Sequence, residues 1–513
     1  MKAPHQLPRN GQEREALRAK GQFWTPLWVA EVMVSYVLRE RAETLFDPAV
    51  GTGAFFQAAK KLAGKLGYLP RFTGSEIDPE ALHLALQSGL TPDDLRAVEQ
   101  RDFVLDPPAG PFPAIVANPP YIRHHRLPSV VKDQLRFFSR WILGRALDGR
   151  TGLHTYFLLR ALSLLDRRGG RLAFILPADV FEGVSAPSLW RWITEHYCLD
   201  CVITFAPEAS PFPEVDVNPA IVLIRAGEPR QHFYWARCLE PNSPELCRWV
   251  LSDFGYQPLH GLGVQLRDLS EALSTGLSRP PRLGGLDSFT LLDFATVRRG
   301  IATGANEFFL LTRWRAESVG IPSEFLVPAV ARTRDVPGDT VDGWLLDRLD
   351  SMGRPTLLFC PDGRPLHQFP RAVRRYLAEA ERRGIPERPL IRTRRPWYKM
   401  ETRKPPAFLF AYLGRRNARF IRNLAGVVPL TGFLCVYPRS EEPSFVEALW
   451  HVLTSDEVIR NLASVGKSYG SGCIKVEPRA LERLPIPKRL IGLLPSGLRT
   501  PFLAAPVQEP LPY

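Results

Sequence analysis

Between residues 44 and 225, short apolar runs alternate with longer segments whose apolar residues recur every three or four positions. The runs include TLFDPAVG at 44–51, AIVANPPY at 114–121 and NPAIVLIR at 218–225. Such runs predict buried β-strands, and the intervening segments, such as AFFQAAKKLAGKL at 54–66, predict amphipathic helices. Strands joined by helices pair in parallel, so we predict an α/β domain with a mostly parallel sheet and antiparallel pairing near its end.

The pattern changes after about residue 240. Proline-rich, irregular segments with short strands then alternate with a few helices, for example FVEALWHVLTSDEVIRNLASV at 445–465. The chain has 513 residues, and one domain commonly has about 100–200. We therefore predict a first domain over 1–240, a second, mixed α+β domain over 241–490, and a proline-rich tail over 491–513.

Composition narrows the class of protein. Hydrophobic residues make up 45% and charged residues 23%, and no stretch reaches the roughly 18 apolar residues of a membrane span. The N-terminal residues are charged and lack the apolar core of a secretory signal. The seven cysteines are scattered, and the one metal-like pair, Cys198 and Cys201, falls in a predicted strand. We expect a cytoplasmic globular protein without a metal site and without a membrane partner.

The basic residues are concentrated in one segment. The formal net charge is +13, and Arg371–Arg422 alone holds sixteen basic and four acidic residues, a local net charge of +12. Aromatic residues such as Trp397 and Tyr398 are interleaved with these arginines. The pattern is typical of a surface that binds a polyanion. A solvated helix face would give the same pattern, and charge alone does not decide between them.

Acidic residues end three successive predicted strands. Asp47 ends the first and is followed by a turn with two glycines and a helix, Glu76 ends the second, and Asp102 follows the third. An isolated carboxylate at a strand end is more often a helix cap. Three in series are different, because the carboxyl ends of parallel strands meet at one edge of the sheet and bind ligands there. The glycine turn brings backbone close to such a ligand, through Ala49, Gly51 and Gly53.

These strand ends predict a binding pocket for S-adenosylmethionine. Asp47 would face an ammonium or hydroxyl group, and Glu76 can accept both hydroxyls of a ribose. Asp102 offers an acceptor for an exocyclic amino group, while Ile77 and Phe103 would cover the two faces of a purine. An adenosine that carries a charged amino-acid tail satisfies all of these groups.

The segment AIVANPPY predicts the chemistry. Asn118 offers a side-chain oxygen, and the prolines Pro119 and Pro120 fix the backbone and lack amide donors, which leaves carbonyls to accept hydrogen bonds from an amine. The adenine amino group is a poor nucleophile, and two acceptors would draw its nitrogen toward tetrahedral geometry. Tyr121 offers a ring on which a base extruded from a duplex can stack.

With these motifs, the chain resembles the gamma group of N6-adenine DNA methyltransferases of restriction–modification type. The resemblance covers roughly residues 21–240. Within this range the motifs follow in the family's order. It implies that Thr25 and Pro26, in GQFWTP, reach the methionine carboxylate, that Asn118 also borders the cofactor, and that Phe212 lies against the flipped adenine. His154 departs from the pattern, since relatives often carry Asn or Asp there.

The resemblance implies a Rossmann-like, S-adenosylmethionine-dependent catalytic domain followed by a DNA target-recognition domain, acting on double-stranded DNA. A cognate restriction endonuclease would be a separate chain. Two alternatives remain: methylation of RNA or of a protein glutamine, and a non-catalytic DNA-specificity subunit. The expected DNA contacts are basic residues of the loop after NPPY and of the +12 segment: Arg123, Arg126, Arg392, Arg394, Arg395, Arg415, Arg416 and Arg419.

Overall fold

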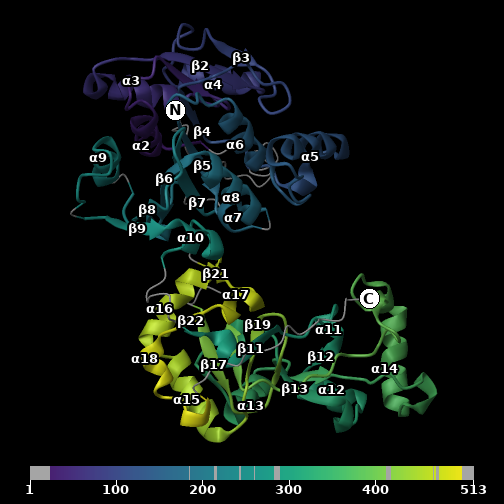
Figure 1. The fold of residues 1–513 in the computed structure, drawn as a ribbon. Coiled ribbons are helices and arrows are strands. Elements are labelled where there is room, and N and C mark those ends of the chain that lie inside the picture. The colour runs from purple at the N-terminus through teal and green to yellow at the C-terminus, as the bar shows by residue number, and fades with distance from the viewer. Residues whose placement is uncertain are drawn as a thin grey trace. The chain divides into compact units, whose positions relative to one another are not determined.

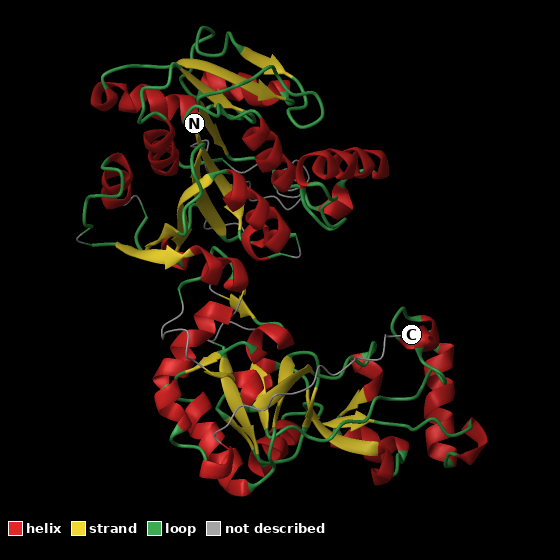
Figure 2. Cartoon of the chain, in the orientation of Figure 1, coloured by secondary structure: helices red, strands yellow, loops and turns green. Residues whose placement is uncertain are grey.

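The computed structural model describes residues 24–498 except 184, 213–216, 242–243, 259, 282–288, 412–417, 466 and 470–472. The chain forms two compact units, one running to Pro281 and the other containing almost all of the described residues after it. Figure 1 shows both, and Figure 2 distinguishes their helices and strands. Among the described residues, no helix has both the length and the apolar character needed to cross a membrane.

The first unit is built around a nine-stranded sheet in the order β3-β2-β1-β4-β5-β7-β6-β8-β9. The strands are β1 Thr44–Asp47, β2 Arg71–Glu76, β3 Val98–Gln100, β4 Ala114–Ala117, β5 Arg171–Pro177, β6 Cys198–Phe205, β7 Pro219–Arg225, β8 His232–Cys238 and β9 Leu262–Asp268. The helices are α2 Leu27–Val37, α3 Ala54–Leu66, α4 Pro79–Gln87, α5 Ser129–Leu143, α6 Leu153–Ser163, α7 Asp179–Glu182, α8 Ala186–His196, α9 Pro244–Leu251 and α10 Leu269–Thr275.

The strand directions confirm the α/β prediction. β3, β2, β1, β4 and β5 pair in parallel, and β6 pairs in parallel with β8. β7 is antiparallel to both β5 and β6, and β9 is antiparallel to β8. The antiparallel strands come late in the chain, as the apolar runs predicted.

Alternating side chains of the strands fill two cores, one on each face of the sheet. In β4, Ala114 and Val116 pack on one face with α2, α3 and α9, while Ile115 and Ala117 pack on the other with α6 and α8. Period-two alternation of buried residues is what a strand covered on both faces requires. The sheet is therefore held rigidly between helices, and its strand ends are fixed in position.

The first unit extends beyond the predicted end at residue 240. β9 lies after residue 240 and extends the sheet beyond β8, and Arg267 of β9, which is 1% exposed, donates to the carbonyls of Gly276 and Leu277 at 3.2 and 3.1 Å. β9 was missed because its apolar alternation is weak, with exposed residues such as Leu266. The compact unit ends at Pro281 instead.

The second unit is mixed α+β, as predicted. Two of its sheets have the orders β11-β19-β16-β17-β14 and β12-β15-β13-β18. Its strands are β10 Phe289–Thr290, β11 Ala295–Arg299, β12 Leu310–Leu311, β13 Leu326–Val330, β14 Thr340–Val341, β15 Leu357–Phe359, β16 Phe408–Ala411, β17 Arg419–Asn423, β18 Val428–Pro429, β19 Phe433–Pro438, β20 Lys467–Tyr469, β21 Cys473–Lys475 and β22 Pro485–Ile486. Its helices are α11 Asn306–Phe309, α12 Arg313–Val319, α13 Gly343–Ser351, α14 Arg371–Arg382, α15 Pro443–Leu453, α16 Asp456–Val465, α17 Pro478–Glu482 and α18 Lys488–Ile491.

The core of the second unit includes residues past the predicted boundary at 490. Ile491 and Leu494 are buried with side chains of α15 and β19. The predicted tail over 491–513 thus begins as packed structure, because its first apolar residues still face the core. Residues 499–513 lie outside the described residues.

Candidate functional site

The site lies where the connections of the first sheet reverse direction. β1 and β4 are neighbours, but the chain passes through β2 and β3 before it returns to β4. In open α/β sheets, ligands bind in the crevice outside the carboxyl ends of the strands at such a switch point. Asp47 is the last residue of β1, and Asn118 directly follows β4. The topology therefore brings the glycine turn after β1 and the NPPY segment after β4 to the same edge of the sheet.

A pocket opens at this edge and contains most of the residues expected to bind a cofactor. Its lining includes nine predicted site residues: Thr25, Ala49, Gly51, Glu76, Ile77, Asp102, Phe103, Asn118 and Pro120. The remaining predicted cofactor and catalytic residues are not in its lining: Pro26, Asp47, Gly53, Pro119 and Tyr121. Residues from five separate segments of the chain thus meet in one pocket, as we predicted from the residues at the ends of the strands.

Glu76 holds the glycine turn in place. The amide of Gly51 donates to Glu76 Oε2 at 2.8 Å, and the amides of Ile77 and Asp78 donate to Oε1 at 2.9 Å each. Gly53 has φ +75°, and a Cβ there would lie 2.2 Å from the Leu90 side chain, so a larger residue does not fit. Glu76 therefore organises the turn as well as facing the pocket.

Asp47 lies beneath the turn and is fully buried. Its Oδ1 accepts a hydrogen bond from the amide of Ala49 at 3.0 Å, while Oδ2 has no partner among the described residues. Burial raises the pKa of this carboxyl well above its usual range. A buried carboxylate oxygen without a donor fits a cationic ligand group, because an unpaired buried charge is costly.

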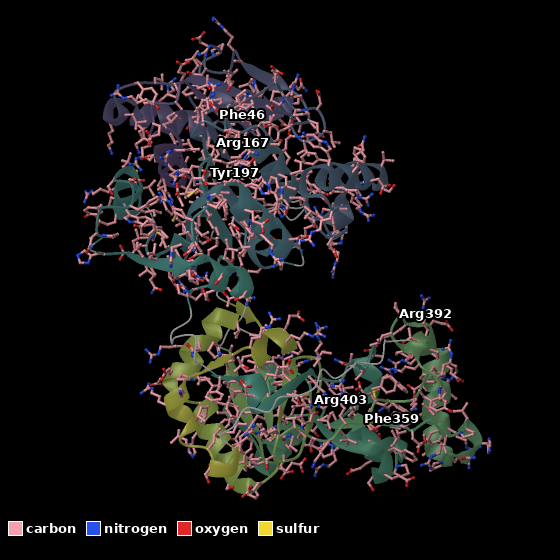
Figure 3. The ribbon with its side chains drawn as sticks, viewed as in Figure 1. Phe46, Arg167, Tyr197, Phe359, Arg392 and Arg403 are labelled. Carbon is pink, nitrogen blue, oxygen red and sulfur yellow. The ribbon has the colours of Figure 1, made fainter. Side chains whose placement is uncertain are left out.

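Asp102 and Phe103 border the pocket as expected. Asp102 Oδ1 accepts from the amides of Val104 and Leu105 at 2.9 and 3.0 Å, which fixes the carboxylate at the strand end. The Phe103 ring is 1% exposed and packs against Phe46 and Phe157. Phe103 belongs to the same hydrophobic core as Phe46, which is labelled in Figure 3, and reaches the pocket from that core.

NPPY contacts the TP element directly. Asn118 Nδ2 donates to Thr25 Oγ1 at 3.1 Å, and Thr25 is 5% exposed. Pro26 follows as the N-cap residue of α2, and its carbonyl accepts from Ala30 at 3.1 Å. The contact fixes the orientation of the Asn118 amide at the edge of the pocket.

Tyr121 is more enclosed than its predicted role requires. Its ring is 8% exposed, and its hydroxyl donates to the carbonyl of Ile175 at 3.1 Å. The ring lies edge-on to His154, with centroids 5.7 Å apart, and burial raises the pKa of Tyr121 well above its usual range. A Cβ on Gly152 would lie 2.4 Å from the His154 ring, so this glycine makes room for it. Phe212 is 5% exposed and belongs to the core on the α2 face.

Sequence reasoning missed several residues of the pocket. Trp24 and Arg101 line it and are the immediate neighbours of predicted residues, which was the available signal. Leu153 and Phe157 also line it from α6, and the amide of Leu153 donates to the carbonyl of Ile122 at 3.0 Å. An apolar helix position carries no sign of facing a ligand, so these two were not predictable.

The arginines of the +12 segment differ in their surroundings. Arg394 Nη2 donates to the carbonyls of Ala302 and Thr303 at 2.8 and 2.9 Å, and Arg419 Nη2 donates to that of Val336 at 2.6 Å. Arg395 Nη1 donates to the Arg392 carbonyl at 2.7 Å.

Arg392 differs from these neighbours. Its own guanidinium has no ion pair or hydrogen bond within the described residues, and it lies on the surface of the second unit (Figure 3). Arg415 and Arg416 lie outside the described residues, and the predicted contacts Arg123 and Arg126 of the first unit are exposed.

Comparison with known proteins assigns the family. Residues 11–233 match the family model "N-6 DNA Methylase", and residues 284–496 match "Type II methyltransferase M.Eco57I, C-terminal domain". The chain belongs to the N6-adenine DNA methyltransferases. The family uses S-adenosylmethionine, which agrees with the pocket at the strand ends and with the unpaired oxygen of Asp47. One matched region lies in each of the two structural units, and neither alternative activity is favoured.

Two relatives of this DNA methyltransferase match along most of their length. Type II methyltransferase M.AccI of Acinetobacter calcoaceticus is 23% identical over 90% of this chain and 84% of its own. Type II methyltransferase M.XamI of Xanthomonas campestris pv. amaranthicola is 25% identical over 91% and 85%. The DNA complex of the Type IIL restriction-modification enzyme MmeI has a similar fold, with TM-score 0.50 and 14% identity over 89% of this chain and 65% of that one. The predicted fold class is confirmed.

Proposed function

We propose that this DNA methyltransferase transfers a methyl group to N6 of an adenine flipped out of a specific duplex sequence, as the modification enzyme of a restriction–modification system. The observation that carries the proposal is the placement of Asn118, which directly follows β4, lines the pocket and is held by Thr25. An amide fixed at that position presents an acceptor to an incoming amine. The carbonyl of Pro119 is the second acceptor.

The cofactor residues follow from the strand ends. S-adenosylmethionine supplies an electrophilic methyl group on a positive sulfonium. Asp47 Oδ2, which is buried without a donor, is proposed to take its ammonium group. Glu76 would accept the ribose hydroxyls while it keeps its bonds from the glycine turn, and Asp102 would accept from the adenine amino group. Thr25, which lies beside Asn118, is placed to reach the methionine carboxylate of the cofactor as well.

The target base would be held by aromatic rings. Tyr121 and Phe212 are proposed to contact the flipped adenine, because stacking offsets part of the cost of removing a base from the duplex. Tyr121 would do this once its ring, which is 8% exposed, is uncovered. His154, whose ring lies edge-on to that of Tyr121, would support it when the base is bound.

The second unit is proposed to select the target sequence. Its basic segment supports contacts with the phosphate backbone, and the guanidinium of Arg392 has no partner among the described residues of that segment. Arg123 and Arg126, close to NPPY in sequence, would contact phosphates beside the flipped base. A separate cognate endonuclease and a cytoplasmic location complete the proposal, and membership of the gamma group is part of it.

Modified-base sequencing tests this proposal. Genomic DNA from cells that express the wild-type chain should carry N6-methyladenine at one short sequence, and DNA from cells that express Asn118→Ala should not. Methylation without a sequence context would reject the role of the second unit, while modified cytosine would reject the proposed chemistry.

A further inference from the structure

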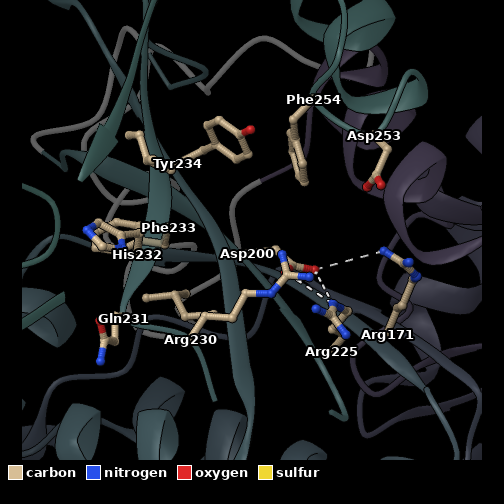
Figure 4. Close-up of a pocket in the computed structure, with 12 residues that line it drawn as sticks. Arg171, Asp200, Arg225, Arg230, Gln231, His232, Phe233, Tyr234, Asp253 and Phe254 are labelled. Carbon is tan, nitrogen blue, oxygen red and sulfur yellow. Dashed lines mark hydrogen bonds and ion pairs between the residues drawn. The ribbon is translucent and has the colours of Figure 1, made fainter. Parts of the chain in front are cut away.

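A second pocket lies at the opposite edge of the same sheet (Figure 4). Arg171 is the first residue of β5, His232 is the first of β8, and Arg225 is the last of the antiparallel β7. All three line the pocket, so it lies where the parallel strands begin, away from Asn118. Its volume of about 650 Å³ is in the range of small-molecule sites, roughly 300–1,000 Å³.

Asp200 in this pocket accepts hydrogen bonds from three neighbouring side chains. Its Oδ2 accepts from Tyr36 at 2.8 Å and from Arg225 Nε at 3.0 Å, and its Oδ1 accepts from Cys198 at 3.2 Å. Figure 4 shows Asp200 between Arg171 and Arg225. The carboxylate therefore fixes the guanidinium of Arg225 by a hydrogen bond, while Arg171 lies farther from it.

Arg171 keeps unused donors in the pocket. The residue is 8% exposed, and its Nη2 bonds to Glu40 at 3.1 Å, while Nε and Nη1 have no hydrogen-bond partner among the described residues. Nη1 is 4.0 Å from Asp200, too far for a hydrogen bond. Buried guanidinium donors are expected to be satisfied, so these two mark a place for acceptor oxygens.

The surroundings of the pocket carry excess positive charge. Arg230 lines it, is exposed, and has no ion pair within the described part of the chain. Among the residues that line the pocket, three guanidinium groups stand against two carboxylates: Arg171, Arg225 and Arg230 against Asp200 and Asp253. Planar guanidinium groups bind phosphate oxygens in a bidentate manner.

Aromatic rings form another part of the wall. The rings of Tyr234 and Phe254 have centroids 5.1 Å apart and are tilted by 36°. Phe254 has φ +64°, a conformation that bulky residues rarely adopt, and its ring also packs on Trp249. The pocket thus combines phosphate-binding donors with a surface for an organic group.

We propose that this pocket binds a small phosphorylated molecule, with the phosphate oxygens held by Arg171 and Arg230 and the organic part against Tyr234 and Phe254. The site is separate from the methyl-transfer pocket and does not depend on the roles assigned there. The same phosphate chemistry could be supplied by a DNA backbone, and the experiment includes an arm that separates the two sources.

Calorimetric titration with pyrophosphate, at constant ionic strength set with sodium chloride, tests the site. Wild type should bind saturably, and Arg230→Gln should bind about tenfold more weakly or worse, since one charge-assisted hydrogen bond is removed. Arg171→Met should also lose binding. Arg191→Gln, in which an exposed arginine of α8 outside the pocket is changed, should bind as wild type does.

Two results would overturn the proposal. One is equal pyrophosphate affinity, or no saturable binding, in wild type and Arg230→Gln, with unchanged thermal unfolding as the check of folding. Arg230 is exposed, so this variant serves even if Arg171→Met does not fold. The other comes from duplex DNA: if Arg230→Gln weakens binding of a duplex oligonucleotide as much as it weakens pyrophosphate binding, the phosphate belongs to DNA. DNA affinity that changes less than twofold supports a small-molecule ligand.

Discussion

Asn118 Nδ2 donates a hydrogen bond of 3.1 Å to Thr25 Oγ1, across 93 residues of sequence. The bond joins NPPY to the TP element before α2 and occupies the nitrogen end of the amide. Its oxygen end is thereby oriented as the acceptor that the proposed mechanism needs. Thr25 therefore acts as a positioning residue for Asn118, in addition to its predicted contact with the cofactor.

Thr25→Val should separate these two roles of Thr25. The substitution keeps the shape and removes the hydroxyl, so kcat should fall by roughly three- to tenfold, as expected for one hydrogen bond of about 0.5–1.5 kcal/mol. Thr25→Ser should restore kcat. Steady-state kinetics and calorimetry with S-adenosylmethionine provide the measurement. A lowered cofactor affinity with unchanged kcat would mean that the hydroxyl serves only the methionine carboxylate.

Asp102→Ala should weaken the binding of S-adenosylmethionine by about 1.5–3 kcal/mol, the usual loss for a hydrogen bond to a charged group. The exposed Asp133 of α5 provides a matched control, since Asp133→Ala removes the same charge away from the pocket. Asp102 also accepts from two backbone amides, so thermal unfolding should be measured in parallel. Equal cofactor affinity for the two variants would remove Asp102 from the binding site.

Asp47 predicts a dependence of stability on pH. Burial raises its pKa in the folded state, so the folded protein holds this proton more tightly than the unfolded chain does. The carboxyl therefore lowers stability increasingly as pH rises from its unfolded pKa, near 3.8, toward the raised folded value.

Asp47→Asn removes this cost. Without cofactor, the variant should melt at a higher temperature than wild type, with a gap that widens over that pH range. Its affinity for S-adenosylmethionine should fall, because the ammonium loses its partner. Melting curves from pH 4 upward, with and without cofactor, provide the test, and a variant that melts lower at every pH would contradict it.

Arg392 and Arg419 should behave differently, although both lie in the +12 segment. Arg392→Gln should reduce the slope of log affinity for duplex DNA against log salt by about one unit, as for a lost phosphate contact. Arg419→Gln should instead lower thermal stability, because its guanidinium caps the carbonyl of Val336. Salt titrations and melting curves of both variants measure this difference. An unchanged slope for Arg392→Gln would leave that arginine as solvated surface.

The sheet and the order of its ligand-facing ends were predictable, because they follow from local patterns. Apolar runs gave the strands, and each carboxylate or NPPY residue lies next to its own strand. The surroundings of Tyr121 were not predictable, since they depend on Ile175 and His154 from other segments. The structural role of Arg394 was also hidden, because its partner Ala302 is 92 residues away.

The most direct test of the account is the identity of the methylated base. Purified protein should transfer labelled methyl from S-adenosylmethionine to duplex DNA, and digestion to nucleosides followed by mass spectrometry should find the label in N6-methyl-2′-deoxyadenosine. Asn118→Ala should bind the cofactor with nearly unchanged affinity and transfer no label. Label on cytosine, or full transfer by Asn118→Ala, would contradict the assignment of Asn118 as the residue that orients an adenine amine.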